Sequence, residues 1–142
     1  MFAELGLPVP KGGTKKLIND ASSSAFHKWQ RQNLGAITVS DLDLFRTKTS
    51  FHHAEFIELK RSYIDVESWR PFRADFPNFL LMNSVARRCG VALTIAYNVR
   101  HKNPLNDDPS VISLFGFSEH GSIIQKCRVS FEAFVAGSYM EN

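Results

Sequence analysis

The sequence predicts an α/β domain in which helices flank a mixed β-sheet. The spacing of its apolar residues changes along the chain from the helical period of 3.6 to the strand period of 2 and back. The resulting order is helix, strand, strand, helix, strand, strand, strand, helix. With 142 residues, of which 44% are hydrophobic and 22% charged, the chain has the size and composition of one globular domain. We therefore expect a single domain over residues 1–142, with the Pro- and Gly-rich residues 1–13 as a flexible arm.

The first half of the chain predicts a helix and a hairpin. Apolar side chains return at helical spacing over residues 17–32, which indicates the first helix. Apolar and polar residues then alternate over residues 37–45 and 54–60, as in two strands. A polar loop over residues 48–53 joins them, and its two histidines, His52 and His53, are expected to be exposed.

The second half predicts a crossover helix and three further strands. The expected elements are a helix over 78–88 that Gly90 ends, strands over 91–99, 111–117 and 122–129, and a final helix from Phe131 to about Tyr139 that Ser130 caps. Pro71 and Pro77 are expected to break the start of the crossover helix. Segment 91–99 is almost continuously apolar, which is typical of a central strand buried on both faces. Pro104 and Pro109 indicate a polar loop before the next strand.

The composition indicates where the protein is located and what kind of partner it has. The opening residues lack the basic start and apolar core of a signal peptide, and no apolar run approaches the ~20 residues that cross a bilayer. We therefore expect a cytoplasmic protein with no membrane partner. Cys89 and Cys127 have neither disulfide-framework nor zinc spacing, and we expect both to be small buried residues. The net charge is +3, but residues 103–142 carry −3 and residues 1–102 carry +6, a distribution that suits a polyanionic partner.

The predicted hairpin carries charged residues where strands usually carry apolar ones. By strand parity, Asp41, Asp43, Glu58 and Lys60 share one face of the hairpin. With a six-residue loop, Asp43 lies opposite Glu58 and Asp41 opposite Lys60. A register shift of two would instead pair Asp41 with Glu58, and the cluster remains in both registers. The same alternation is also typical of the solvated face of an edge hairpin.

Such a cluster suits a divalent cation. Close carboxylates repel one another unless a cation compensates, and Mg²⁺ takes oxygen ligands from one or two carboxylates, waters and substrate phosphate. Asp43 and Glu58, with the backbone carbonyl of Leu59, are the candidate ligands. Lys60 is a candidate to orient water or to stabilise charge that develops on phosphorus. These residue types predict a site for phosphodiester hydrolysis.

The order "SDLDLF", loop, "EFIELKRS", helix and "VALTIAYNV" resembles the PD-(D/E)XK nuclease superfamily over roughly residues 37–99. The resemblance implies a restriction endonuclease-like core (αββαβ) followed by C-terminal strands and a helix. It implies that Asp43 is the metal-binding aspartate, Glu58 the second carboxylate and Lys60 the catalytic lysine, with Asp41 competing for the first role. No proline precedes either aspartate, the first helix offers only Asp20 in place of a glutamate, and the second helix lacks the glutamine of several branches.

The resemblance also implies partners and cofactors. The expected activity is that of a Mg²⁺-dependent endonuclease or exonuclease, with Mn²⁺ as a possible substitute, and the expected substrate is nucleic acid, with DNA favoured over RNA. The basic residues after the motif are Arg61, Arg70 and Arg73, interleaved with Trp69 and Phe72, and they are candidates for phosphate contacts. The small size suits a phage or mobile-element protein that acts as a homodimer or with a protein that supplies specificity. The alternative is a catalytically inactive nucleic-acid-binding or protein-interaction module on the same fold.

Overall fold

The computed structural model describes residues 24–33, 42–47 and 54–141. The chain divides into two units between Asp41 and Leu42. In the first unit, the structure describes one helix, α1 (Ser24–Asn33), which coincides with the second half of the predicted helix over residues 17–32. The predicted arm lies outside the described residues, and so do Asp20, Asp41, His52 and His53.

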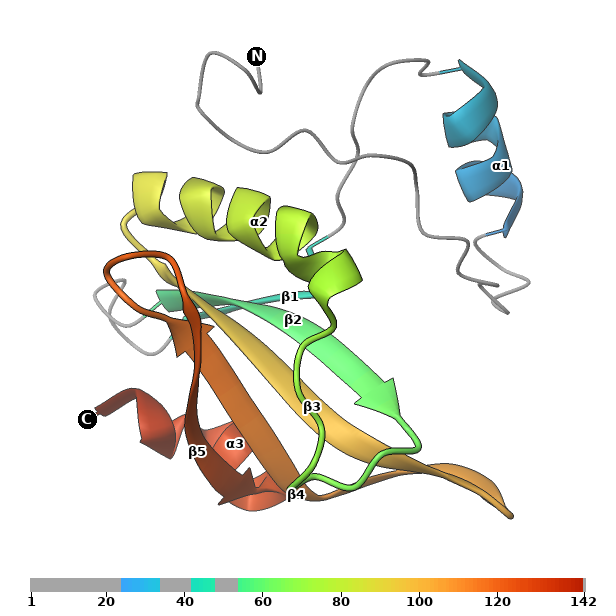
Figure 1. Ribbon diagram of the computed structural model, residues 1–142, viewed down its shortest axis with the longest axis vertical. Helices are drawn as coiled ribbons and strands as arrows, with labels where there is room; N and C mark the ends of the chain where they lie inside the picture. Colours follow the sequence, from blue (N-terminus) through green and yellow to red (C-terminus); the bar gives the residue numbers. More distant parts are fainter. Residues whose placement is uncertain (1–23, 34–41, 48–53, 142) are drawn as a thin grey trace. The chain divides into compact units, whose positions relative to one another are not determined.

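The second unit is built on a five-stranded mixed sheet in the order β1-β2-β3-β4-β5 (Figure 1). Its strands are β1 (Leu44–Thr47), β2 (Ala54–Ser62), β3 (Ala92–Lys102), β4 (Leu105–Phe117) and β5 (Ile123–Ser130). Neighbouring strands are antiparallel except β2 and β3, which are parallel because helix α2 (Phe76–Arg88) crosses over between them. The predicted α/β class with a mixed sheet and flanking helices is confirmed, and so is the predicted order of elements.

Helix α2 begins earlier than the sequence predicts. A short 3-10 helix (Arg73–Asp75) leads into it, and Pro77 lies within its first turn instead of breaking it. Proline is tolerated there because the first N–H groups of a helix have no intrahelical acceptor. The predicted end is confirmed, since Cys89 caps the helix and Gly90 follows with a φ of 70°.

One face of the sheet packs against α2 and the loop before it. Phe79 from α2 is fully buried against Ile95 and Tyr97 of β3. The indole of Trp69 stacks on the Tyr97 ring with a centroid separation of 4.1 Å, and it meets the Phe115 ring edge-on at 5.3 Å. The aromatic cluster fixes the loop after β2 as well as the helix. The predicted burial of the central strand is confirmed, since all five residues from Leu93 to Tyr97 are buried.

The opposite face packs against the C-terminal segment. Helix α3 (Phe131–Ala136) and a 3-10 helix (Ser138–Glu141) follow β5. The Ser130 hydroxyl accepts a hydrogen bond from the N–H of Ala133 at 3.1 Å, which confirms the predicted cap. Gly137 ends α3 with a φ of 66°, so the regular helix is shorter than predicted. Phe134 and Tyr139 of this segment contact the second apolar cluster, formed by Ile57, Ala96, Ile112 and Leu114.

The predicted loop before residue 111 is wrong. Strands β3 and β4 run through this segment and turn at the cis peptide bond Asn103–Pro104. Pro109 fits because it lies where the β3–β4 register shifts, between the pairs Val99–Asp108 and Tyr97–Ser113. Beyond Val99, β3 has no further partner in β2, so the two strands leave the sheet as a two-stranded ribbon (Figure 1).

The predicted burial of the cysteines is also wrong. Cys89 and Cys127 are both exposed. Cys89 caps α2 at its solvent-facing end, and Cys127 lies on β5, an edge strand whose residues are mostly exposed. Among the described helices, none is long and apolar enough to cross a membrane.

Candidate active site

The register of the β1–β2 hairpin brings the predicted acids together. Thr47 pairs with Ala54 across residues 48–53, and Leu44 pairs with Ile57 at the far end of β1. The predicted register is therefore confirmed, and Asp43 and Glu58 occupy the next pair of positions. Strand β1 begins at Leu44, so Asp43 precedes the strand instead of lying within it, as the predicted range 37–45 required. Asp41, which would face Lys60, lies outside the described residues.

The Asp43 side chain is anchored on the backbone of β2. Its Oδ2 atom accepts a hydrogen bond from the N–H of Leu59 at 2.8 Å. A side-chain oxygen thus takes a backbone donor of β2 just before β1 begins. One oxygen of Asp43 is therefore fixed beside Leu59, the residue between Glu58 and Lys60. A carboxylate can accept further bonds after this one.

Glu58 and Lys60 form a shielded ion pair on the face of β2 that α2 covers. Lys60 Nζ lies 2.5 Å from Glu58 Oε1, and the two side chains are 15% and 8% exposed. Lys60 Nζ also lies 5.3 Å from the ring centroid of Phe79 on α2, within the range of a cation–π contact. A buried carboxylate is costly without a cation, and the lysine supplies one positive charge beside it. Helix α2 therefore helps to hold the ammonium group next to the acid.

The donor set of this site fits a hard divalent cation. Asp43 and Glu58 converge on the same short stretch of β2, and Leu59 between Glu58 and Lys60 offers its carbonyl oxygen. Mg²⁺ usually needs only one or two protein carboxylates because waters and phosphate complete its octahedron. Over residues 24–33, 42–47 and 54–141, no group of three or more His, Cys, Asp or Glu side chains is placed to hold a metal.

The three predicted phosphate-binding arginines have different surroundings. Arg61 is paired with Asp107 at 3.1 Å, and its side chain is 59% exposed. Arg70 donates from Nη1 to the carbonyls of Glu67 and Trp69, both at 2.7 Å, so it closes the loop before α2. Arg73 is exposed at the start of the 3-10 helix. Of the interleaved aromatics, Trp69 is part of the core, and Phe72 is half exposed.

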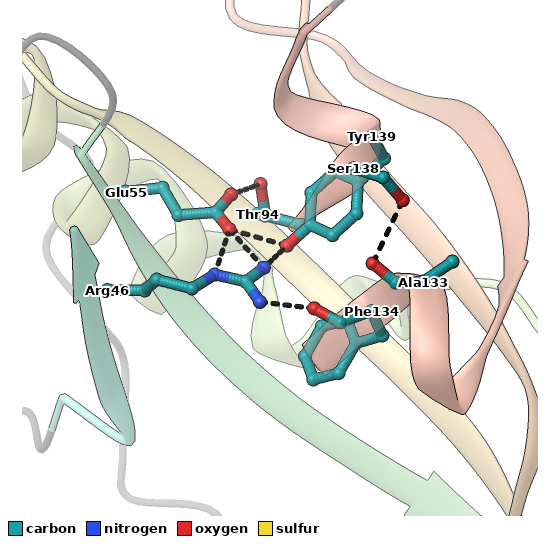
Figure 2. A network of polar contacts seen from close by, with 7 residues as sticks. All are labelled: Arg46, Glu55, Thr94, Ala133, Phe134, Ser138 and Tyr139. Atoms are coloured by element: carbon teal, nitrogen blue, oxygen red, sulfur yellow. Dashed lines mark hydrogen bonds and ion pairs between the residues drawn. The ribbon is translucent and has the colours of Figure 1, made fainter. Parts of the chain in front are cut away.

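Sequence reasoning missed a second polar cluster on the opposite face of β2 (Figure 2). Glu55 is 3% exposed and forms a cross-strand pair with Arg46, whose Nη2 lies 2.6 Å from Oε1. Thr94 donates to the other carboxylate oxygen at 2.7 Å, and the Tyr139 hydroxyl donates to Oε1. The Arg46 guanidinium also donates to the carbonyl of Phe134 and lies about 5 Å from the Phe134 and Tyr139 rings.

The hydrogen bonds and the ion pair of this second cluster connect the C-terminal segment to the hairpin. Its partners come from β1, β2, β3 and the segment after β5, so one buried carboxylate connects elements that are far apart in the sequence. The opposite charges of residues 46 and 55, which face each other in the predicted register, are the signal that could have found its centre.

Comparisons with known proteins identify no relative of this chain. The chain matches no family model, and searches of curated proteins and of solved structures give no significant match.

Proposed function

We propose that the chain is a metal-dependent nuclease of the PD-(D/E)XK type with a restriction endonuclease-like core. One observation carries the proposal: just before β1 begins, the Asp43 carboxylate accepts a hydrogen bond from the N–H of Leu59, the residue between the paired Glu58 and Lys60 in the sequence. Two carboxylates and one lysine beside one short stretch of β2 are groups that can support metal-assisted phosphodiester hydrolysis. The parallel β2-α2-β3 unit that follows the motif supports the same assignment.

Each residue has a distinct role in this proposal. Asp43 and Glu58, with the Leu59 carbonyl, would hold Mg²⁺ or Mn²⁺. The bound cation would supply Lewis-acid stabilisation of the negative charge that develops on the phosphate oxygens. Lys60 would donate hydrogen bonds from Nζ to the attacking water or to a phosphoryl oxygen. Its position beside Glu58 and the Phe79 ring supports this role, because a preorganised donor needs no rearrangement as charge develops.

The proposed substrate is nucleic acid, with DNA favoured over RNA. The formal charge of +6 on residues 1–102 supports a polyanionic partner. Arg73 is the best placed of the three predicted arginines to contact phosphate, because Arg61 is paired with Asp107 and Arg70 with loop carbonyls. A homodimer or a partner protein that supplies specificity is also part of the proposal.

Cleavage assays with matched variants test the proposal. Single-stranded, duplex and branched DNA and RNA are incubated with the purified chain and Mg²⁺, Mn²⁺ or EDTA. We expect metal-dependent cleavage that Glu58→Gln and Lys60→Ala each reduce by about 10²-fold or more. The exposed residues Glu119 and Lys126 give the matched controls Glu119→Gln and Lys126→Ala, which should cleave like the wild type. Thermal unfolding of each variant separates loss of the site from loss of the fold.

Two results would contradict the proposal. Equal cleavage by the wild type and both site variants would place the chemistry elsewhere. Binding of nucleic acid by the wild type, without cleavage in any metal, would favour the inactive binding module instead.

A further inference from the structure

A second candidate site lies where the β3–β4 ribbon leaves the sheet. A groove of about 650 Å³ opens between the loop after β2 and the ribbon, and we call it the ribbon groove. Its lining includes Tyr63, Asp65 and Glu67 from the loop, and Arg100, Lys102 and Asp108 from the ribbon. The lining is about half polar and half apolar, and the groove is open to solvent.

The loop that carries Tyr63 is held rigidly. The buried Tyr97 hydroxyl donates to the carbonyl of Ile64 at 2.5 Å and contacts the Ser62 hydroxyl at 2.9 Å. The Asp65 carboxylate accepts from the N–H of Ser68 at 2.8 Å. These bonds fix the backbone on both sides of Tyr63, so the groove wall is preformed and ligand binding would order little chain.

Tyr63 presents an aromatic ring to this groove. The residue is 54% exposed, although most large aromatic side chains of the sheet core are buried. Lys102 Nζ lies 4.6 Å from its ring centroid, so a cation covers part of one side of the ring. A half-exposed ring on a fixed loop is a stacking surface, and every nucleobase has a flat face that can stack on it.

The charges of the groove suit a nucleobase better than a phosphate. The lining holds Arg100 and Lys102 together with three carboxylates, those of Asp65, Glu67 and Asp108, so its formal charge is −1 with His101 neutral. Arg100 is also bound to Asp107, with Nε 2.8 Å from Oδ1. A phosphate would meet repulsion here, whereas a neutral base, thymine and uracil included, can donate an N–H to a carboxylate and accept from a cation through a carbonyl oxygen.

The groove lies close to the candidate active site. Val66 and Val99 of its lining pack in the same apolar cluster as Phe79, whose ring lies beneath Lys60 Nζ. Tyr63 follows Lys60 by three residues, about 10 Å along an extended strand. A nucleic-acid strand with a phosphate at Lys60 can therefore place a neighbouring base in the ribbon groove.

We propose that the ribbon groove binds one unstacked base of a single-stranded nucleic acid, with Tyr63 as the stacking surface. This inference rests on the proposed function and names its substrate class: strands with unpaired nucleotides, in preference to continuous duplex. The bases of a duplex are stacked and paired, so their faces cannot reach Tyr63.

Fluorescence anisotropy in EDTA tests the proposal without cleavage. The full chain is titrated with labelled oligothymidylate, oligouridylate, a duplex and an abasic strand, all of equal length. We expect Tyr63→Leu to weaken binding of both base-bearing single strands about tenfold. Tyr63→Phe keeps the ring, and Phe131→Leu removes a half-exposed ring from α3, so both should bind within about twofold of the wild type. The abasic strand should bind the wild type no better than Tyr63→Leu binds the base-bearing strands.

The outcomes separate this inference from the proposed function. The groove assignment would be overturned if Tyr63→Leu bound single strands with wild-type affinity, or if it lost as much affinity for duplex and abasic strands as for base-bearing single strands. Metal-dependent cleavage would be unaffected by either result. Tyr63-dependent binding by a chain that cleaves nothing in Mg²⁺ or Mn²⁺ would retain the groove and overturn the nuclease.

Discussion

Removing the Arg46 side chain should cost more stability than any exposed charge in the second unit. Arg46 supplies the cation beside Glu55, which is only 3% exposed, and its own side chain is 18% exposed. In Arg46→Ala the carboxylate keeps Thr94 and Tyr139 as hydrogen-bond donors but loses its countercharge. Removing one partner of a buried ion pair costs about 3–5 kcal/mol of unfolding free energy. Loss of the contacts to the Phe134 and Tyr139 rings acts in the same direction.

Urea denaturation followed by circular dichroism measures this loss. The matched control is Arg61→Ala, because Arg61 forms an ion pair with Asp107 that is largely exposed. The control should change the unfolding free energy by less than about 1 kcal/mol. The double variant Arg46→Met/Glu55→Leu removes both charges and keeps apolar volume, so it should lose less than Arg46→Ala alone.

A specific result would refute this reasoning. If Arg46→Ala unfolds within about 1 kcal/mol of the wild type, the cluster does not hold a charged carboxylate in a desolvated setting. A double variant that is less stable than Arg46→Ala would show that Glu55 stabilises the fold without its arginine. Limited proteolysis adds a local readout, since Arg46→Ala should expose the segment after β5 to cleavage before the sheet unfolds.

Two further predictions concern the ribbon and the core. The Ser110 hydroxyl and N–H, with a contribution from His101, lower the pKa of Asp108 from 3.8 to about 2. This carboxylate therefore stabilises the ribbon above about pH 3.8 and ceases to do so as the pH falls towards 2; NMR titration should show the low pKa in the wild type and a higher one in Ser110→Ala. Trp69→Ala removes a ring that stacks on Tyr97 and should lower the unfolding free energy by about 3–5 kcal/mol, whereas Phe131→Ala, at a half-exposed position, should change it by less than about 1 kcal/mol in the same urea titration.

Local patterns in the sequence predict the elements of the sheet and the hairpin register. Burial on one or both faces of a strand sets the spacing of its apolar side chains. The alternation over residues 54–60 therefore predicts one strand, and the apolar run over 91–99 predicts another. The length of the 48–53 loop then determines which residues face one another, and the observed pairs follow it. Asp43 and Glu58 could be placed together for this reason alone.

Features that depend on distant partners could not be predicted in the same way. Prolines 104 and 109 indicate a loop by composition, but the turn and the register shift in the ribbon accommodate both. The exposure of Cys127 depends on β5 being the last strand of the sheet, which no local pattern reports. Tyr139 reaches Glu55 only because the C-terminal segment packs back on the face opposite α2.

Strand β2 carries buried carboxylates on both faces, and their partners distinguish a structural role from a chemical one. Glu55 is bound by side chains from β1, β3 and the C-terminal segment, so its cation cannot leave without moving several elements. Glu58 is bound by Lys60, a flexible side chain two residues along the same strand. The ammonium group is held beside this acid and the Phe79 ring, and Asp43 is fixed at the intervening residue. A cation held beside two oxygen donors is what the proposed chemistry requires, whereas the cluster around Glu55 connects distant elements of the fold.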